Sequence, residues 1–247
     1  LVYITSDKCY ENVEWVYGYR EDDRLGGKDP YSASKACAEI AFHAYYESFF
    51  KDSNVRVATV RAGNVIGGGD WAASRIVPDC MRAWSEKEAV QLRAPNATRP
   101  WQHVLEPLSG YLWLGACLTG NQGKSLSGES FNFGPDASVN HPVKTLIENL
   151  ASHWPGAKWG IDKQTQAMKE AGLLKLSCDK ALYHLQWQAS MTFAETVEMT
   201  ATWYRDYYQG ADAKTLTQNQ IKTYMQLATQ RKQVWMSNST QPSMASA

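Results

Sequence analysis

The sequence predicts an α/β fold built around a parallel sheet. Two apolar, β-branched segments, Leu1–Thr5 and Val55–Arg61, are separated by a polar loop and by a segment with helical periodicity. Strands that alternate with helices, and that are apolar enough to be buried, are typical of parallel sheets covered by helices. With 247 residues, 44% of them hydrophobic, the chain can bury the core of one large domain or of two modest ones.

The elements follow from local patterns. After the strand Leu1–Thr5, residues 11–29 form a predicted loop because they contain three glycines and many charges. A helix is expected from Pro30 to about Phe50, since proline favours the first helical turn. Its buried face is predicted from residues that recur at spacings of four, three and four, namely Ala33, Cys37, Ile40 and Ala44. Further strands are predicted at Val55–Arg61, Ala89–Leu92 and Phe131–Phe133, and helices at Ser74–Ser85, Glu106–Leu118, Val143–Ala151, Asp179–Leu185 (with Asp179 as N-cap), Phe193–Tyr208 and 214–232.

Composition excludes several classes of function. Lys plus Arg and Asp plus Glu both total 25, so charge gives no reason to expect a nucleic-acid or membrane partner. The five cysteines are widely spread and form no Cys-x-x-Cys pair, which predicts reduced thiols in a cytoplasmic protein. Ten Trp and thirteen Tyr fit either core packing or a site for sugars and bases. The Ser- and Ala-rich tail from Ser237 is expected to be disordered.

The clearest chemical pattern is Tyr31–Lys35, with the sequence Tyr-Ser-Ala-Ser-Lys, at the start of the first helix. Residues four apart lie on one helical face, so the phenol and the ammonium group can reach one pocket. A neighbouring cation favours the phenolate, which can take a proton from a sugar hydroxyl while a hydride leaves to a nicotinamide. Such a pattern also arises on ordinary helix surfaces. The strand end at Thr5-Ser6 adds context, because a Ser or Thr there with Tyr-x-x-x-Lys on the next helix resembles the extended short-chain dehydrogenases. That resemblance implies that Ser6 hydrogen-bonds the reacting hydroxyl or the phenol, although Ser6 also suits a turn or a cap.

A longer set of motifs resembles the nucleotide-sugar 4,6-dehydratases of the extended short-chain dehydrogenase family, and among them the CDP-glucose enzymes. The resemblance covers about residues 1–208. It is carried by Thr5–Asn12, Glu14-Trp15, Gly18–Glu21, Leu25–Gly27, Asp29–Ser32, Arg61–Trp71, Arg99–Val104, Asn132–Pro135 and Trp203-Tyr204. The family implies NAD as cofactor, held in part by Tyr31 and Lys35, a nucleotide-sugar substrate, and a homodimer in which the helix that begins at Tyr31 packs against its copy.

The resemblance also implies roles for Asp7 and Lys8. Relatives that act on dTDP- and GDP-sugars carry Asp-Glu at this place, whereas 4-epimerases lack such a pair. After C4 oxidation a dehydratase must remove the C5 proton and protonate the leaving C6 hydroxyl. Asp7 would be the acid at O6, and Lys8 stands where Glu serves as the C5 base. Lys8 can accept a proton only when it is neutral, so stabilising the enolate is its alternative role.

Substrate contacts are expected from three residues by the same resemblance: Asn64, Arg99 and Asn132. A guanidinium binds phosphate oxygens with two hydrogen bonds, which suits Arg99, and Arg75 is a second phosphate candidate. Turn positions for the two asparagines and a surface position for the arginine are the alternatives. His103 lies in an apolar stretch and is expected to be a core histidine.

The expected organisation is the C-terminal part of a Rossmann-type parallel-sheet domain (residues 1–62 and 99–135) plus a smaller mixed α/β substrate-binding domain (residues 63–98 and 136–232), with a tail at 233–247. No Gly-x-Gly-x-x-Gly turn is present, and the chain opens on a strand without a methionine. It is therefore expected to be a fragment that lacks the adenine and pyrophosphate contacts to NAD. Epimerase or reductase chemistry, and for this chain alone a binding role without catalysis, are the alternatives.

Overall fold

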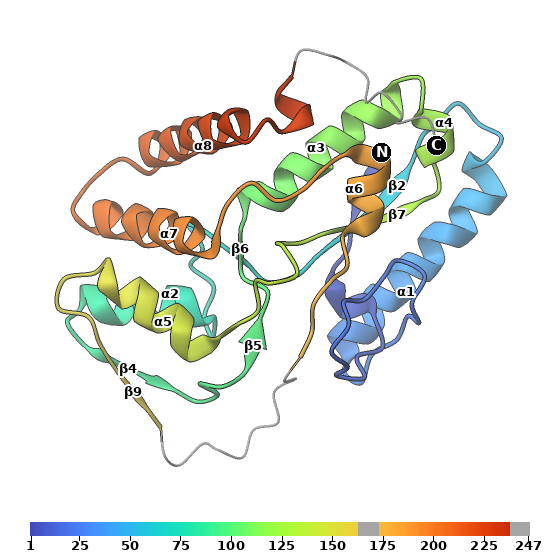
Figure 1. Cartoon of the computed structure of the whole chain (residues 1–247). Coiled ribbons are helices and arrows are strands. Elements are labelled where there is room, and N and C mark those ends of the chain that lie inside the picture. Colours follow the sequence, from blue (N-terminus) through green and yellow to red (C-terminus); the bar gives the residue numbers. More distant parts are fainter. Residues whose placement is uncertain (163–172, 238–247) are drawn as a thin grey trace.

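The computed structural model describes residues 1–162 and 173–237 (Figure 1). Its first part is a parallel three-stranded sheet in the order β1 (Val2–Ile4), β2 (Ala58–Ala62) and β7 (Ser130–Phe133). The helices α1 (Pro30–Tyr45), α3 (Leu105–Thr119) and α6 (Asp179–Leu185) pack around this sheet (Figure 1). The predicted α/β class with parallel strands is confirmed.

The two faces of the sheet differ in chemistry because side chains alternate along each strand. One face is apolar and packs against α3 and α6; it is formed by Val2, Ala58, Val60, Phe131 and Phe133. The other face lies under α1 and is polar; it is formed by Thr59, Arg61, Ser130 and Asn132, all buried. The register pairs Thr59 with Ser130 and Arg61 with Asn132, so the polar residues of neighbouring strands lie side by side.

The orientation of α1 follows from this polar face, and the predicted buried face of the helix is wrong. The expected residues Ala33, Cys37, Ile40 and Ala44 lie towards solvent or are half-buried. The residues that point to the sheet are Ser32, Ala36, Glu39 and Phe42. The apolar pattern predicted the wrong face because Glu39 forms an ion pair with Arg61 of the sheet. A charged residue therefore lies on the inner face of the helix.

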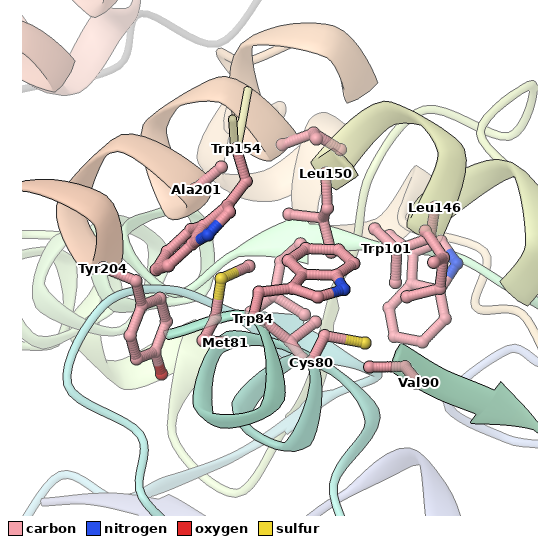
Figure 2. Close-up of a cluster of buried hydrophobic side chains, with 14 of the residues drawn as sticks. Cys80, Met81, Trp84, Val90, Trp101, Leu146, Leu150, Trp154, Ala201 and Tyr204 are labelled. Carbon is pink, nitrogen blue, oxygen red and sulfur yellow. The ribbon is translucent and has the colours of Figure 1, made fainter. Parts of the chain in front are cut away.

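The second part of the molecule is a helical layer beside a short sheet. Three helices, α2 (Ile76–Ser85), α5 (Val143–Ser152) and α7 (Phe193–Tyr208), bury the cluster in Figure 2, which includes Met81, Trp84, Leu150, Trp154 and Tyr204. The parallel strands β4 (Ala89–Leu92) and β9 (Lys158–Ile161) flank it, and Val90 and Leu92 of β4 are buried in it. Much of the unusual tryptophan content therefore serves core packing.

Short elements connect the two parts. The two-residue strands β3 (Val65–Ile66) and β6 (Gln102–His103) pair in parallel, and β5 (Thr98–Arg99) pairs with β8 (His141–Pro142) in antiparallel fashion. The small helix α4 (Gly123–Leu126) leads into β7, and a π-helical turn over Tyr46–Phe50 extends α1. The long helix α8 (Ala213–Gln230) follows α7 and ends near a 3₁₀ turn at Val234–Met236.

Three details depart from the sequence expectations. Helix α6 packs on the sheet of the first part, although residues 136–232 were assigned as a whole to the second domain. Strand β3 pairs with β6 across the expected boundary between the domains. Cys178 is the N-cap of α6, and Asp179 is its first residue rather than its cap. The tail beyond residue 237 lies outside the described residues. Within them, no helix is long and apolar enough to cross a membrane.

Candidate active site

The turn after β1 presents three neighbouring polar residues to one cavity. β1 ends at Ile4, and a 3₁₀ turn over Asp7–Cys9 begins directly after Ser6. The Ser6 hydroxyl accepts a hydrogen bond from the Lys8 amide at 3.2 Å and donates one to Asp7 Oδ1 at 2.9 Å. Ser6 therefore acts as the cap of this turn while its oxygen remains beside the cavity.

Asp7 is buried, and its surroundings favour the protonated carboxyl group. Burial raises its pKa above the ordinary value, although the charge of Lys8 and the hydrogen bond from Ser6 act in the opposite direction. The absence of a side chain at Gly63 makes room for this carboxyl, since a Cβ there would lie 3.4 Å from Asp7 Oδ2. A buried carboxyl group with a raised pKa is suited to donating a proton.

Tyr31 and Lys35 lie on the first turns of α1, opposite the turn that carries Asp7. Asp29 caps the helix by accepting hydrogen bonds from the Ser32 amide at 3.0 Å and from its hydroxyl at 2.6 Å. The ammonium group of Lys35 lies 5.6 Å from the centre of the Tyr31 ring. Tyr31 is 57% exposed, so its phenol is open to a ligand.

A cavity of about 620 Å³ joins these groups. Of the site residues predicted from the sequence, Ser6, Asp7, Lys8, Tyr31, Asn64 and Arg99 line it, together with the secondary candidate Arg75. Lys35 lies behind Tyr31 and does not line the cavity itself. The far wall comes from α2 and from Val90–Ala94 at β4. The cavity is large enough for an organic ligand and has the catalytic candidates at one end.

Arginine side chains bring positive charge to the lining of the cavity, which also contains carboxylates. Arg99 lies at the end of β5 and donates one guanidinium hydrogen bond to the Thr98 carbonyl oxygen at 2.7 Å. Arg75, at the start of α2, forms an ion pair with Asp70 at 2.9 Å. Both residues line the cavity, where phosphate groups would find charged donors.

Asn132, the third residue expected to contact the substrate, does not line this cavity. It is fully buried in the polar face under α1. Its amide nitrogen donates to the carbonyl oxygens of Tyr19 and Ser177, and its oxygen accepts from the Tyr10 hydroxyl at 2.8 Å. Asn132 faces inward because strand alternation puts it on the same side as Arg61, its partner in β2.

Sequence reasoning missed the buried ion pair between Glu39 and Arg61. A charged residue at the end of an otherwise apolar strand was the available signal, because such a residue must find a partner when the strand is buried. His103 is buried as expected, and burial lowers its pKa to about 4.

Comparison with known proteins defines the family. Residues 1–127, just over half of the chain, match the model of the NAD dependent epimerase/dehydratase family. The chain therefore belongs to this family. Over 235 residues it is 42% identical to a CDP-glucose 4,6-dehydratase of Salmonella typhimurium. That match covers 93% of this chain but 65% of the relative, so the chain spans less than two thirds of the relative's length.

Solved structures share the fold at lower identity. A dTDP-glucose 4,6-dehydratase from Bacillus anthracis, solved in complex with NAD, superposes with a TM-score of 0.68 at 20% identity, covering 87% of this chain and 64% of that one. A UDP-glucuronic acid 4-epimerase from Bacillus cereus, in complex with UDP-glucuronic acid and NAD, gives a TM-score of 0.68 at 18% identity, covering 84% of this chain and 62% of that one. The fold is therefore of the Rossmann type found in epimerases and dehydratases.

Proposed function

We propose that this chain carries the catalytic and substrate-binding residues of an NAD-dependent CDP-glucose 4,6-dehydratase. The observation that carries the proposal is the meeting of Ser6, Asp7, Lys8 and Tyr31 in one cavity, with the acid of the set buried and held towards its protonated form. The 42% identity to a CDP-glucose 4,6-dehydratase supports the choice of reaction and of substrate.

The residues present fit the reactive end of NAD. Tyr31 is exposed at the cavity and has a cation beside its ring, which suits a group that must reach a nicotinamide riboside and a sugar at once. Tyr31 and Lys35 would hold this end of the cofactor. When bound, NAD would accept a hydride from C4 of the sugar and later return it to C6.

The first chemical step needs a base at the C4 hydroxyl. Tyr31, with the Lys35 ammonium group 5.6 Å from the centre of its ring, would take the proton of the C4 hydroxyl. The Ser6 hydroxyl lines the same cavity and would hydrogen-bond the reacting oxygen, which orients the sugar. The product of this step is a 4-keto sugar whose C5 proton is acidified.

The second step eliminates water across C5 and C6. Asp7 donates its proton to the departing C6 oxygen, a role that its raised pKa favours. Lys8 lies directly beside Asp7 and either receives the C5 proton or stabilises the enolate by its charge. Reduction at C6 and protonation at C5 would then give the 4-keto-6-deoxy sugar.

The nucleotide part of the substrate would lie along the arginine side chains that line the cavity. Arg99 would bind the pyrophosphate, with Asn64 and Arg75 near the same segment. The choice of cytidine as the base rests on the 42% identity to a CDP-glucose 4,6-dehydratase. We thus assign the catalytic role to the sheet with its helices and the substrate-binding role to the helical layer. We also propose that the protein is cytoplasmic.

The test is an assay of dehydration with competing substrates. The chain is purified alone and also joined to the part of the Salmonella relative that the match does not cover. Each protein receives NAD and CDP-glucose, dTDP-glucose or GDP-mannose, and the 4-keto-6-deoxy product is measured by its absorbance in alkali. Product from CDP-glucose without net formation of NADH is expected.

Matched variants separate the roles. Tyr31→Phe should abolish product, because no group then takes the C4 proton, whereas Tyr17→Phe, at an exposed tyrosine outside the cavity, should leave the rate unchanged. Epimerised or reduced products instead of dehydrated ones would reject the dehydratase. Nucleotide-sugar binding without any product, in both proteins, would favour a binding role.

We also propose a homodimer in which α1 packs against its copy. The outer face of α1 and of the turn after it is apolar and exposed, and it includes Ile40, Tyr45 and Phe49. An exposed apolar helix face of this kind is typical of an interface. Ile40→Glu should convert a dimer to a monomer in light scattering, whereas Ile221→Glu on α8 should not. A monomeric unmodified chain would reject the dimer.

A further inference from the structure

The polar face under α1 holds a buried ion pair that cannot touch a ligand. Arg61 Nε lies 2.9 Å from Glu39 Oε1, and Arg61 Nη2 lies 2.9 Å from Glu39 Oε2. The two side chains are 1% and 0% exposed and do not line the cavity. Taking two charges out of water is costly, and a packed apolar pair often stabilises a fold equally well. Stability alone therefore does not explain this buried ion pair.

The pair is embedded in directional hydrogen bonds. Glu39 also accepts from the hydroxyl groups of Thr5 and Thr59. Arg61 Nη1 donates to the Tyr10 hydroxyl at 2.7 Å and to the Glu21 carbonyl oxygen at 2.9 Å. Burial alone would raise the pKa of Glu39, but the hydrogen bonds and charge of Arg61, with the hydrogen bonds from the threonines, outweigh it and hold this pKa below its ordinary value. The carboxylate therefore stays charged.

The partners of the pair flank the proposed catalytic groups in the chain. Thr5 directly precedes Ser6, and Tyr10 follows Lys8 by two residues. Glu39 lies one helical turn after Lys35 on α1, so it moves with the face that carries Tyr31 and Lys35. The network thus joins the only two backbone segments of the described residues that carry the proposed proton-transfer groups.

We propose that Glu39 and Arg61 are positioning residues that fix α1, with Tyr31 and Lys35, relative to the turn Ser6–Lys8. The inference rests on the proposed function, in which oxidation at C4 uses both segments and elimination at C5 and C6 follows without release of the sugar. Charge-assisted hydrogen bonds fix distance and angle, whereas apolar contacts are not directional. A displacement of about 1 Å between reacting groups can cost on the order of 100-fold in rate.

Two isosteric threonine variants test the connection. Thr5→Val removes the hydrogen bond that links Glu39 to the segment of Ser6, and Thr59→Val removes an equally buried hydrogen bond from strand β2 to the same carboxylate. We expect kcat for CDP-glucose to fall about tenfold or more in Thr5→Val with KM changed by less than about threefold, and to stay within about twofold in Thr59→Val. Equal effects of the two variants on kcat would overturn the proposal.

A second measurement does not depend on activity. Amide hydrogen exchange of residues 5–10 and 30–45 is compared in the unmodified chain, in Glu39→Gln and in Glu106→Gln. Glu106 is an equally buried carboxyl group that binds the Ser190 and Met191 amides, away from α1. Both segments should exchange faster in Glu39→Gln alone. Unchanged amide exchange in Glu39→Gln would overturn the proposal, even if the dehydratase assignment stands. If the unmodified protein is inactive but both segments exchange faster in Glu39→Gln, only the dehydratase assignment is rejected.

Discussion

The buried His103 makes a quantitative prediction about stability and pH. Its ring is 1% exposed, its Nδ1 accepts a hydrogen bond from the Leu105 amide at 3.3 Å, and burial lowers its pKa from 6.5 to about 4. In the unfolded chain the imidazole takes up a proton as the pH falls through about 6.5, whereas in the folded chain it does so only near pH 4. The unfolded state therefore binds more protons in this window, and the free energy of unfolding falls as the pH is lowered.

The size of the effect follows from the difference between the two pKa values. They differ by about 2.5, and each pH unit corresponds to ~1.4 kcal/mol, so folding loses about 3 kcal/mol between pH 6.5 and pH 4. For a chain of this size, ~1 kcal/mol changes the melting temperature by about 2 to 4 °C. His103→Asn removes this proton uptake. Between pH 6.5 and pH 4, the drop in its melting temperature should therefore be about 6 to 12 °C smaller than the drop in the unmodified chain.

The assay is thermal unfolding followed by circular dichroism from pH 7 to pH 4. Buried carboxyl groups with raised pKa values, such as Asp7 and Glu106, change stability with pH in the opposite direction, but they are the same in both proteins and cancel in the difference. His184→Asn, at an exposed histidine, is the control and should leave the pH dependence unchanged. Parallel curves for His103→Asn and the unmodified chain would refute the reasoning.

Three further predictions concern single positions. Lys8→Glu, which introduces the residue that the dTDP- and GDP-sugar dehydratases carry, should retain part of the dehydration rate if Lys8 is the C5 base, whereas Lys8→Ala should lose ~100-fold or more in kcat. Gly68→Ala should cost about 1 to 3 kcal/mol in a denaturant titration, because its Cβ would lie 2.1 Å from the ring of Trp203; Gly115→Ala, with 3.8 Å to its nearest neighbour, should not destabilise the fold. Asp29→Ala should lower the melting temperature by loss of the α1 cap, and an unchanged melting temperature would contradict this.

Several elements were predictable because their patterns are local. Strand β4 and helices α6 and α7 have the bounds expected from periodicity and from flanking residues. The two-residue strands β3, β5, β6 and β8 were not expected, since such short segments become strands only through partners far away in the sequence. Tertiary pairing, rather than local preference, defines them.

The residues of the site differ in how far the sequence alone predicts them. Tyr31 and Lys35 follow from a spacing that one helix face enforces, and they lie together in the structure. Ser6, Asp7 and Lys8 needed the position at a strand end and the resemblance to a family, and they line the same cavity. Asn132 lies in a buried hydrogen-bond network outside the cavity lining, and a polar residue near a strand end suggests such a network as readily as it suggests a ligand contact.

The polar face of the sheet explains why the buried face of α1 was predicted wrongly. The sheet face under α1 is polar, so the helix turns Glu39 inward to Arg61 and leaves Ile40 exposed. An apolar inner face would have matched the sequence pattern, but it would have left Arg61 buried without its charged partner on α1. The apolar residues of the helix are therefore left on its outer face, where the proposed dimer would bury them.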